Sequence, residues 1–475
     1  MRKPASFDPV ALAIAAAWLA LYTWRSMVGH YSLGTNAFDL SVFDYALWNL
    51  VHHGTGHVPF MGYSIFSHHF MPILVVLAPV YAVFQSPVFL LVFQLVATAA
   101  AALALFALAR RFGAPRLHAL VLLAVFLLSR RTHSAVAGYF YPESLQALFT
   151  FLLVLAWRTG GWKYWTVLLL FLMTKEDAAI YAGAFAVSAF LLPDPNPRRS
   201  GFTLAAACLW FGAALFLAIP ASRAADGLSL ANPLLESRFG SPSGHVQIGV
   251  LLGRMLSTAT AGTFANLLLM AAALPLAAPL WLLPALPGLL INVVAEPGSM
   301  QAALSDHYVW PVLPWLFIAA AAGIVRIGSR SSRAALVWTL VWMVATFADN
   351  PALRRILSTR LDAEAADVRA HLPVLDAAAV VLAQPSVIPH LTHVPYLYAT
   401  GGGARAPRQP DVVLLTTVGN VWPHTHEEVL NLIAQYQRDT AYDRVGQGPL
   451  AVFVRRGSQS LTRTARNAAE SSSRR

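Results

Sequence analysis

Charged residues and cysteine are scarce in this sequence, and both shortages exclude classes of protein. Of its 475 residues only 12% are charged and 57% are hydrophobic, too apolar a mixture for an ordinary water-exposed surface. Cys208 is the only cysteine, which excludes an intramolecular disulfide. Lysine occurs only as Lys3, Lys163 and Lys175, and this preference for arginine suggests a GC-rich bacterial source. The composition predicts a polytopic membrane protein.

The formal net charge of +11 does not indicate a nucleic-acid partner. In a soluble protein such an excess would suggest one, but here much of it stands between apolar segments, where it sets the orientation of membrane helices. No soluble block combines basic and aromatic residues in a nucleic-acid-binding motif. We therefore expect a lipid bilayer, and no nucleic acid, as a partner.

Residues 1–349 contain 11 to 12 apolar segments and are expected to form an all-α polytopic membrane domain. Several segments are shorter than the ~20 residues of a perpendicular span, and prolines such as Pro279 and Pro284 interrupt the later ones. This pattern predicts broken or re-entrant helices, which are tolerated only when buried in protein or lining a wet cavity. The segments are residues 10–22, 72–84, 88–108, 117–128, 145–157, 164–173, 178–192, 202–219, 264–278, 280–294, 309–324 and 334–347.

The positive-inside rule predicts the orientation of this domain. Basic clusters mark the side assigned to the cytoplasm: Arg2 with Lys3, Arg110 with Arg111 and Arg116, Arg158 with Lys163, Arg198 with Arg199, and Arg326 with Arg330 and Arg333. Residues 30–70, 130–143, 222–245 and 295–307 then face outward. Residues 164–192 must cross twice through a break at the string TKED. The first apolar run lacks a cleavage pattern and is interpreted as a retained anchor.

Residues 350–456 have the composition of a small soluble domain, expected on the extracytoplasmic side. Helical patterns in LDAEAADVRAHL and HEEVLNLIAQYQRD alternate with the strand-like runs AAAVVLAQ, DVVLLTT and GPLAVFVRR. This alternation predicts an α/β fold. The GGG at residues 401–403 lacks the strand and helix of a phosphate-binding loop and is interpreted as a flexible turn. Residues 457–475, rich in Ser and Arg, are expected to be disordered.

The first outer loop, residues 30–70, contains Asp39 and Asp44 but no Lys or Arg. Residues 38–51 have the pattern of an amphipathic helix lying in the membrane interface, with Asp39 near its start. Asp39 is either a catalytic acid or a helix cap. Asp44 lies about 140° away around such a helix, so the two acids are not expected to share one task. The histidines here, including His68 and His69, match no metal-ligand motif and are interpreted as interfacial polar residues, or as ligands of a divalent metal ion.

Three further polar clusters fall on the predicted outer face. The first contains Arg130, Arg131, Tyr139, Tyr141, Pro142 and Glu143, the second is Thr174-Lys175-Glu176-Asp177, and the third contains Asp306, His307 and Tyr308. Charges at membrane depth are costly and indicate function by default. The simpler readings are a helix break in which Lys175 pairs with Glu176 or Asp177, and an ordinary helix start at Asp306.

The ordered strings FDLSVFDYALWN, HHFMPILVVLAPVYAVF, YPESLQALF, TKEDAAIYA and HYVWPVLPWLF resemble the bacterial membrane proteins of family DUF2079. That family is similar to C-type (GT-C) membrane glycosyltransferases, which use polyprenyl-phosphate sugars and carry an essential acid in the first outer loop. The resemblance implies an enzyme of the bacterial plasma membrane that transfers a sugar to a hydroxyl of a glycan, lipid or protein. The configuration at the anomeric carbon would be inverted in the transfer. It places Asp39 at the catalytic position, with Asp44 as a second candidate.

The chemistry of sugar transfer suggests roles for the other polar residues. A carboxylate would take the proton of the acceptor hydroxyl while cations stabilise the departing phosphate. Lys175, Arg130 and Arg131 are the candidate phosphate ligands. Candidates for binding the sugar or a divalent ion are His68, His69, Tyr139, Glu143 and Glu176, and His307 with Tyr308 would close the pocket. A neutral imidazole is an alternative base.

Two other functions fit the same residues. In a transporter or lipid flippase, Lys175 and Glu176 would be coupling or gating charges, and broken helices suit that reading too. No corresponding short segments occur in two halves of the chain, as inverted-repeat transporters tend to have. A non-catalytic assembly protein, working through its outer domain, is the third alternative.

Overall fold

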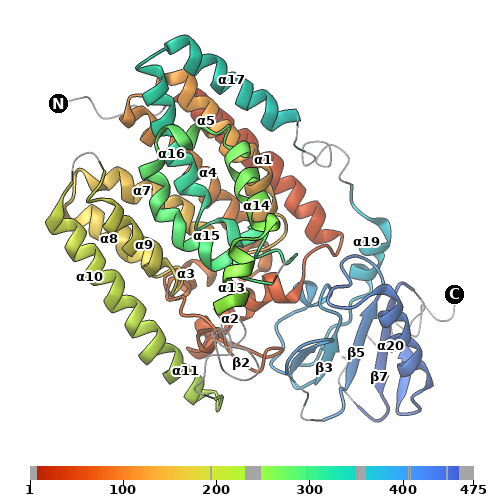
Figure 1. Cartoon of the computed structure of the whole chain (residues 1–475). Coiled ribbons are helices and arrows are strands. Elements are labelled where there is room, and N and C mark those ends of the chain that lie inside the picture. The colour runs from red at the N-terminus through yellow and green to blue at the C-terminus, as the bar shows by residue number, and fades with distance from the viewer. Residues whose placement is uncertain are drawn as a thin grey trace.

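The computed structural model describes residues 8–192, 195–229, 248–296, 298–348, 350, 360–404, 406, 408–445 and 448–458. A helical domain comes first, and an α/β domain, drawn in blue in Figure 1, lies at one end of it. The basic pair expected at residues 2 and 3, much of the loop expected at 222–245 and nearly all of the expected disordered tail fall outside the described residues.

Helices form most of the first domain. They are α1 (Pro9–Tyr31), α2 (Val42–His53), α3 (Ile73–Tyr81), α4 (Pro87–Phe112), α5 (Arg116–Leu128), α6 (Arg130–Ala135), α7 (Ser144–Trp157), α8 (Gly161–Leu172), α9 (Ala178–Ser188), α10 (Pro197–Ala213), α11 (Ile219–Ala225), α13 (Ile248–Met255), α14 (Thr258–Met270), α15 (Leu286–Val293), α16 (Leu313–Gly328) and α17 (Ser332–Ala348). Short π and 3-10 turns are η1 (Ala37–Ser41), η2 (Ile65–Ser67), η3 (Ala214–Ala218), η4 (Leu274–Ala277), η5 (Pro279–Ala285) and η6 (Asp306–Val309). Strands β1 (His57–Val58) and β2 (Tyr63–Ser64) form a small hairpin.

Every apolar segment expected from the sequence overlaps a helix, but few of these helices are long. By length and composition, three in the described chain could cross a membrane: Pro9–Tyr31, Pro87–Phe112 and Pro197–Ala225. A fourth candidate is the pair α13 and α14, which is bent by 43°. The others have 8 to 17 residues, and the proline-rich stretch breaks into η4, η5 and α15. The expected broken helices are confirmed.

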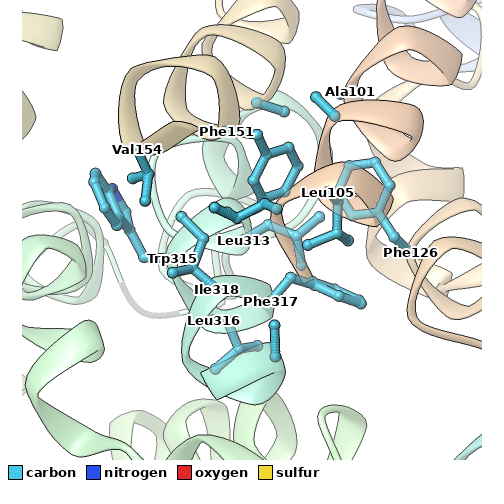
Figure 2. Close-up of a cluster of buried hydrophobic side chains, with 14 of the residues drawn as sticks. Ala101, Leu105, Phe126, Phe151, Val154, Leu313, Trp315, Leu316, Phe317 and Ile318 are labelled. Carbon is cyan, nitrogen blue, oxygen red and sulfur yellow. The ribbon is translucent and has the colours of Figure 1, made fainter. Parts of the chain in front are cut away.

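Small side chains bring the central helices close together. Figure 2 shows the resulting cluster, in which Phe126 of α5 meets Phe151 of α7 and Phe317 of α16 edge-on, with ring centroids 5.6 and 5.2 Å apart. Gly323 of α16 lies against the carbonyl of Leu274 in η4, where a Cβ would clash. Without a hydrophobic drive between helices in lipid, such close packing supplies much of the association energy.

Helices α8 and α9 form a hairpin with Lys175 and its acidic neighbours at the tip. Gly160 before α8 lies against Arg199, and Leu192 after α9 lines a cavity together with Arg111 and Arg158, so both arms start from the basic end. The predicted break is therefore confirmed. With 12 and 11 residues, each arm reaches only about 16–18 Å, less than the ~30 Å hydrocarbon core. Neither arm is a full perpendicular crossing.

The opposite end of the domain gathers the loops expected to share one face. Arg131 Nη1 donates to the carbonyl of Ala303 at 2.7 Å, which joins residues 130–143 to residues 295–307. Ser67 and Ser222 hydroxyls lie 2.7 Å apart, which joins the first outer loop to the end of α11. The expected outer loops thus share one end of the helices, and Arg111, Arg158 and Arg199 lie at the other.

The α/β domain contains a five-stranded sheet with the order β4-β3-β5-β7-β6. Its elements are α19 (Ala363–Ala370), β3 (Val381–Ala383), η7 (Ile388–His390), β4 (Leu397–Ala399), β5 (Val412–Thr416), α20 (His426–Arg438), β6 (Tyr442–Val445) and β7 (Leu450–Arg455). Strand β3 is parallel to β4 and β5, whereas β7 is antiparallel to β5 and β6. Both helices and β3, β5 and β7 were predicted. The short strands β4 and β6 were missed, and residues 401–403 lie in a turn as expected.

The α/β domain docks on the first outer loop through backbone hydrogen bonds. Ala37 N donates to Pro385 O at 3.0 Å, and Asn420 N donates to Leu33 O at 2.9 Å. Helix α2 is buried beneath this contact, and its Tyr45 is 2% exposed. The expectation of a helix lying in the membrane interface was wrong, because protein rather than lipid covers the apolar face of α2.

Candidate functional site

Asp39 lies in η1, a π-helical turn that follows from local capping. The Asn36 side chain accepts from Phe38 N and caps this turn, so Asp39 is not the cap. Its Oδ1 instead accepts from the Tyr141 hydroxyl at 2.5 Å, and no hydrogen bond to Oδ2 occurs within the described chain. Burial raises the pKa of the Asp39 carboxyl, the Tyr141 hydrogen bond opposes this rise, and the charge of Asp306 adds to it.

Tyr141 connects Asp39 to the third polar cluster. Its ring stacks on His307 with centroids 3.7 Å apart, and Tyr308 lies next to His307 at 4.0 Å. Phe140 N donates to Asp39 O at 3.1 Å, which fixes the two chain segments to each other. Burial and the neighbouring Asp39 charge raise the pKa of Tyr141 well above its usual value, so the phenol remains a donor.

Lys175 and Glu143 form a buried ion pair, with Nζ and Oε1 2.6 Å apart and exposures of 7% and 3%. The sequence offered Glu176 or Asp177 as the partner of Lys175, and the structure adds Glu143, the residue before α7, as the acid that accepts its hydrogen bond. Glu143 Oε2 is buried and has no hydrogen-bond partner among the described residues. A buried carboxylate oxygen of this kind is an available acceptor.

Lys175 and Glu143 share a small cavity with residues of the third cluster. The cavity has a volume of about 20 Å³. It is lined by Glu143, Lys175, Asp177, Tyr181, Ile291, Asn292, Gln301, His307, Tyr308 and Pro311. That space holds little more than one water molecule. Asp39 does not line it and reaches it only through the stacked rings of Tyr141 and His307.

The other acidic residue of the hairpin tip binds the first outer loop. Glu176 Oε1 lies 2.8 Å from His69 Nδ1, and its Oε2 accepts from Phe70 N at 2.9 Å. The His68 ring lies beside His69, with centroids 4.5 Å apart. Of the sugar-binding candidates, Glu176, His68 and His69 therefore lie together, next to the Lys175 cavity. Tyr139 holds a different position, where its carbonyl accepts from Gln94.

Arg130 and Arg131 line a different and larger cavity of about 560 Å³. Arg131 is anchored by the carbonyls of Ala303 and Leu304, and Arg130 is exposed. The structure therefore separates the arginines from Lys175, although the sequence grouped all three as ligands of one phosphate.

Asp44 is buried at 3% exposure and faces the α/β domain. Its Oδ1 accepts from the Tyr81 hydroxyl at 2.5 Å, and its Oδ2 lies 2.7 Å from His393 Nε2. The His393 ring in turn stacks on Trp48, with centroids 5.1 Å apart. Asp44 thus joins the two domains, since Oδ1 is engaged by Tyr81 of α3 and Oδ2 by His393 of the α/β domain.

No group of three His, Cys, Asp or Glu side chains that could hold a metal ion occurs in the described ranges. His69 and Glu176 supply two candidate ligands. His52 is instead engaged with Gln85 at 2.8 Å.

Sequence reasoning gave no role to one residue that shapes this site and missed another. Tyr141 was placed in the first polar cluster, but its contact with Asp39 was not predicted. His393 lies in the other domain, 349 positions from Asp44, and nothing local in the sequence indicates that contact.

The fold and this polar end define a helical membrane protein with an α/β domain docked over its first long loop. The family of predicted membrane proteins designated DUF2079 matches residues 29–448, and the chain belongs to it. No curated protein matches the chain.

Proposed function

We propose that this protein is an inverting glycosyltransferase of the bacterial plasma membrane, using a polyprenyl-phosphate sugar on the extracytoplasmic face. The observation that carries the proposal is the state of Asp39. Its carboxylate is partly exposed, is held through one oxygen by Tyr141, and retains a second oxygen for a ligand. Burial that raises its pKa also makes it a stronger base.

In the proposed reaction Asp39 Oδ2 takes the proton of an acceptor hydroxyl. The hydroxyl oxygen forms a bond to the anomeric carbon from the side opposite the phosphate, and the bond from that carbon to the phosphate oxygen breaks. The electron pair leaves with the phosphate, whose charge is stabilised by Arg130 and Arg131, while Lys175, on its separate cavity, stays paired with Glu143. Tyr141 holds Asp39 in place, since its hydroxyl donates to Oδ1.

Sugar recognition falls to the groups around the hairpin tip. Glu143 Oε2 accepts from a sugar hydroxyl in this scheme, while Lys175 keeps Glu143 ionised through their 2.6 Å contact. Glu176 with His68 and His69, and His307 with Tyr308, form the adjoining walls, and Tyr139 supports the loop. The site must widen for a sugar, because the present cavity of about 20 Å³ is too small. The α/β domain, fixed to the first loop, covers the site and selects the acceptor.

Transport of a lipid-linked sugar is the second candidate, since α14 and α13 are bent and the hairpin tip carries charge. The two functions differ in what Asp39 does. In transport, flux depends on Lys175 and Glu176 and survives the change Asp39→Asn. In transfer, no product forms without the carboxylate.

The test is mass spectrometry of cell-envelope glycans and polyprenyl-phosphate sugars in cells with the native protein, without it, and with Asp39→Asn. Glu427→Gln, which removes an exposed carboxylate from α20 of the α/β domain, is the control. We expect one lipid-linked sugar to accumulate in the absence of the protein and in Asp39→Asn at normal protein levels, but not in Glu427→Gln. Full product formation by Asp39→Asn would refute the proposal.

A further inference from the structure

We propose that the cavity lined by Arg130 and Arg131 binds the phosphate headgroup of an amphiphile whose hydrocarbon chain leaves between α14 and α17. The inference rests on the proposed function only where it identifies this ligand as the sugar donor. Binding of the ligand is measured independently of sugar transfer. The alternative source of the same chemistry is free phosphate. Lys175 is not part of this site.

The two arginines supply positive charge at the cavity wall. Nη1 of Arg131 donates to the carbonyls of Ala303 and Leu304, and Arg130 has no hydrogen-bond acceptor among the described residues. The charge of Asp306 acts on Arg131, and Oδ1 of Asp306 accepts a hydrogen bond from Ser134 at 2.5 Å. Guanidinium groups that line one cavity match the oxygens of a phosphate.

Lys175 is a poorer phosphate ligand because Glu143 already neutralises it at 2.6 Å. A phosphate there would have to displace a buried carboxylate or share its cation. The Arg130–Arg131 cavity requires no such exchange. Its volume of about 560 Å³ also falls within the range of ligand sites, whereas the Lys175 cavity does not.

The remaining walls indicate a ligand with an apolar part. Leu269 and Met270 from α14, and Trp342 and Ala345 from α17, line the cavity. Leu269 is 73% exposed, and Val341, one turn before Ala345 on α17, is 60% exposed. In a membrane protein such exposed apolar faces meet lipid, so a chain can pass sideways between the two helices into the bilayer.

The cavity is connected to Asp39 through two residues, Ser134 and Asp306. Ser134 lines it and donates to Asp306, and the charge of Asp306 acts on both Arg131 and Asp39. A phosphate bound at the arginines would therefore place its sugar toward the polar cluster. This arrangement gives the donor and the base separate but adjoining positions.

The test measures binding by the full-length protein in a nonionic maltoside detergent, with farnesyl phosphate as the probe. Farnesol lacks the phosphate, and inorganic phosphate lacks the chain. We expect Arg130→Gln to weaken farnesyl phosphate binding about tenfold, and the double change R130Q/R131Q to weaken it further. R330Q/R333Q, which removes the same charge at the opposite end of α16 and α17, should leave affinity unchanged.

Each outcome decides the matter. Equal affinity for farnesol, equal affinity for inorganic phosphate, or an equal effect of R330Q/R333Q would overturn the proposal. Because Arg131 also anchors residues 303 and 304, Arg130→Gln carries the conclusion if the double variant fails to fold. Ala345→Trp, which fills the apolar side, should weaken farnesyl phosphate but not inorganic phosphate. Asp39→Asn should bind normally even though it makes no product, so a failure of this site is distinguishable from a failure of the proposed reaction.

Discussion

The surroundings of Asp39 and of Asp44 differ sharply, although the two residues are five positions apart in the same loop. The Asp39 carboxylate accepts one hydrogen bond from the described residues, from the Tyr141 hydroxyl, and the residue is partly exposed. Asp44 is buried, with Tyr81 on one oxygen and His393 on the other. A carboxylate with both oxygens engaged stabilises a fold, whereas one with a spare oxygen and restricted solvation is available for chemistry.

The same contrast separates two kinds of contact between the loop and the rest of the protein. Around Asp39 the partners come from the helical domain, through Tyr141 and the stacked His307. Around Asp44 they come from both domains, and His393 fixes the sheet to α2. The first region is therefore where substrate would be handled, and the second is where the α/β domain is held.

The largest expected effect is the loss of transfer in Asp39→Asn. Removing a general base typically costs a factor of about 10²–10⁴, while the amide keeps the shape of the side chain and the Tyr141 hydrogen bond. Product formation by purified protein in liposomes measures it, with thermal unfolding to show that the fold persists. If Asp44→Asn lost as much activity without unfolding, the division between the two acids would be mistaken.

Asp44→Ala should produce the largest loss of stability in the loop, about 3 kcal/mol, because it leaves the Tyr81 hydroxyl and His393 without their buried partner. Chemical or thermal unfolding of the detergent-solubilised protein measures the change. In a double-mutant cycle, D44A/H393A should cost less than the sum of the single changes. Additive costs would show that the 2.7 Å contact does not couple the domains.

Acid should weaken the docking of the α/β domain through His390, which stacks on His30 with ring centroids 4.3 Å apart. Burial, followed by the nearby His30 and Arg369, lowers the pKa of His390 from 6.5 to about 3. The unfolded chain therefore binds more protons, and stability is lost as the pH falls below 6.5 toward 3. Between pH 7 and pH 4 the free energy of unfolding should fall less in His390→Phe than in the native protein. An equal fall in both proteins would exclude His390 as the cause.

The smallest expected effect is a rise in stability in Asp39→Asn near neutral pH. Because burial raises the folded-state pKa of Asp39, the folded chain holds this proton more tightly, and stability is lost as the pH rises through the raised value. The neutral amide avoids that loss. Thermal unfolding at pH 7 and at pH 4 measures the stability of both proteins. The stability gain of Asp39→Asn over the native protein should be smaller at pH 4. A destabilised Asp39→Asn at pH 7 would mean that the carboxylate holds the fold, as Asp44 does.

Patterns that depend on nearby residues predicted much of this fold. Runs of apolar residues located the helices, prolines located the break at residues 274–285, and alternating patterns located α19, α20, β3, β5 and β7. Strands β4 and β6, of three and four residues, were missed because segments this short carry little sequence pattern. The membrane-interface assignment for α2 was wrong because α2 meets residues of the α/β domain that are more than 300 positions away.

Candidate residues were easier to find than their partners. A charge in an apolar run is visible in the sequence because burying it is expensive, so Lys175, Glu143 and Asp39 could be named. Which of them meet depends on how hairpin α8–α9 inserts beside α7, and that placed Lys175 on Glu143. The same packing put Arg130 and Arg131 on a separate cavity.

The sequence by itself determined that this is a helical membrane protein with a small α/β domain and a polar end, because hydropathy and local periodicity act over a few residues. Only the tertiary structure decided that Asp39 keeps a spare oxygen while Asp44 holds the domain, and that the cations divide between two sites. Hydrogen bonds and ion pairs act over a few ångströms between residues distant in the chain, so their partners follow from packing rather than from sequence spacing.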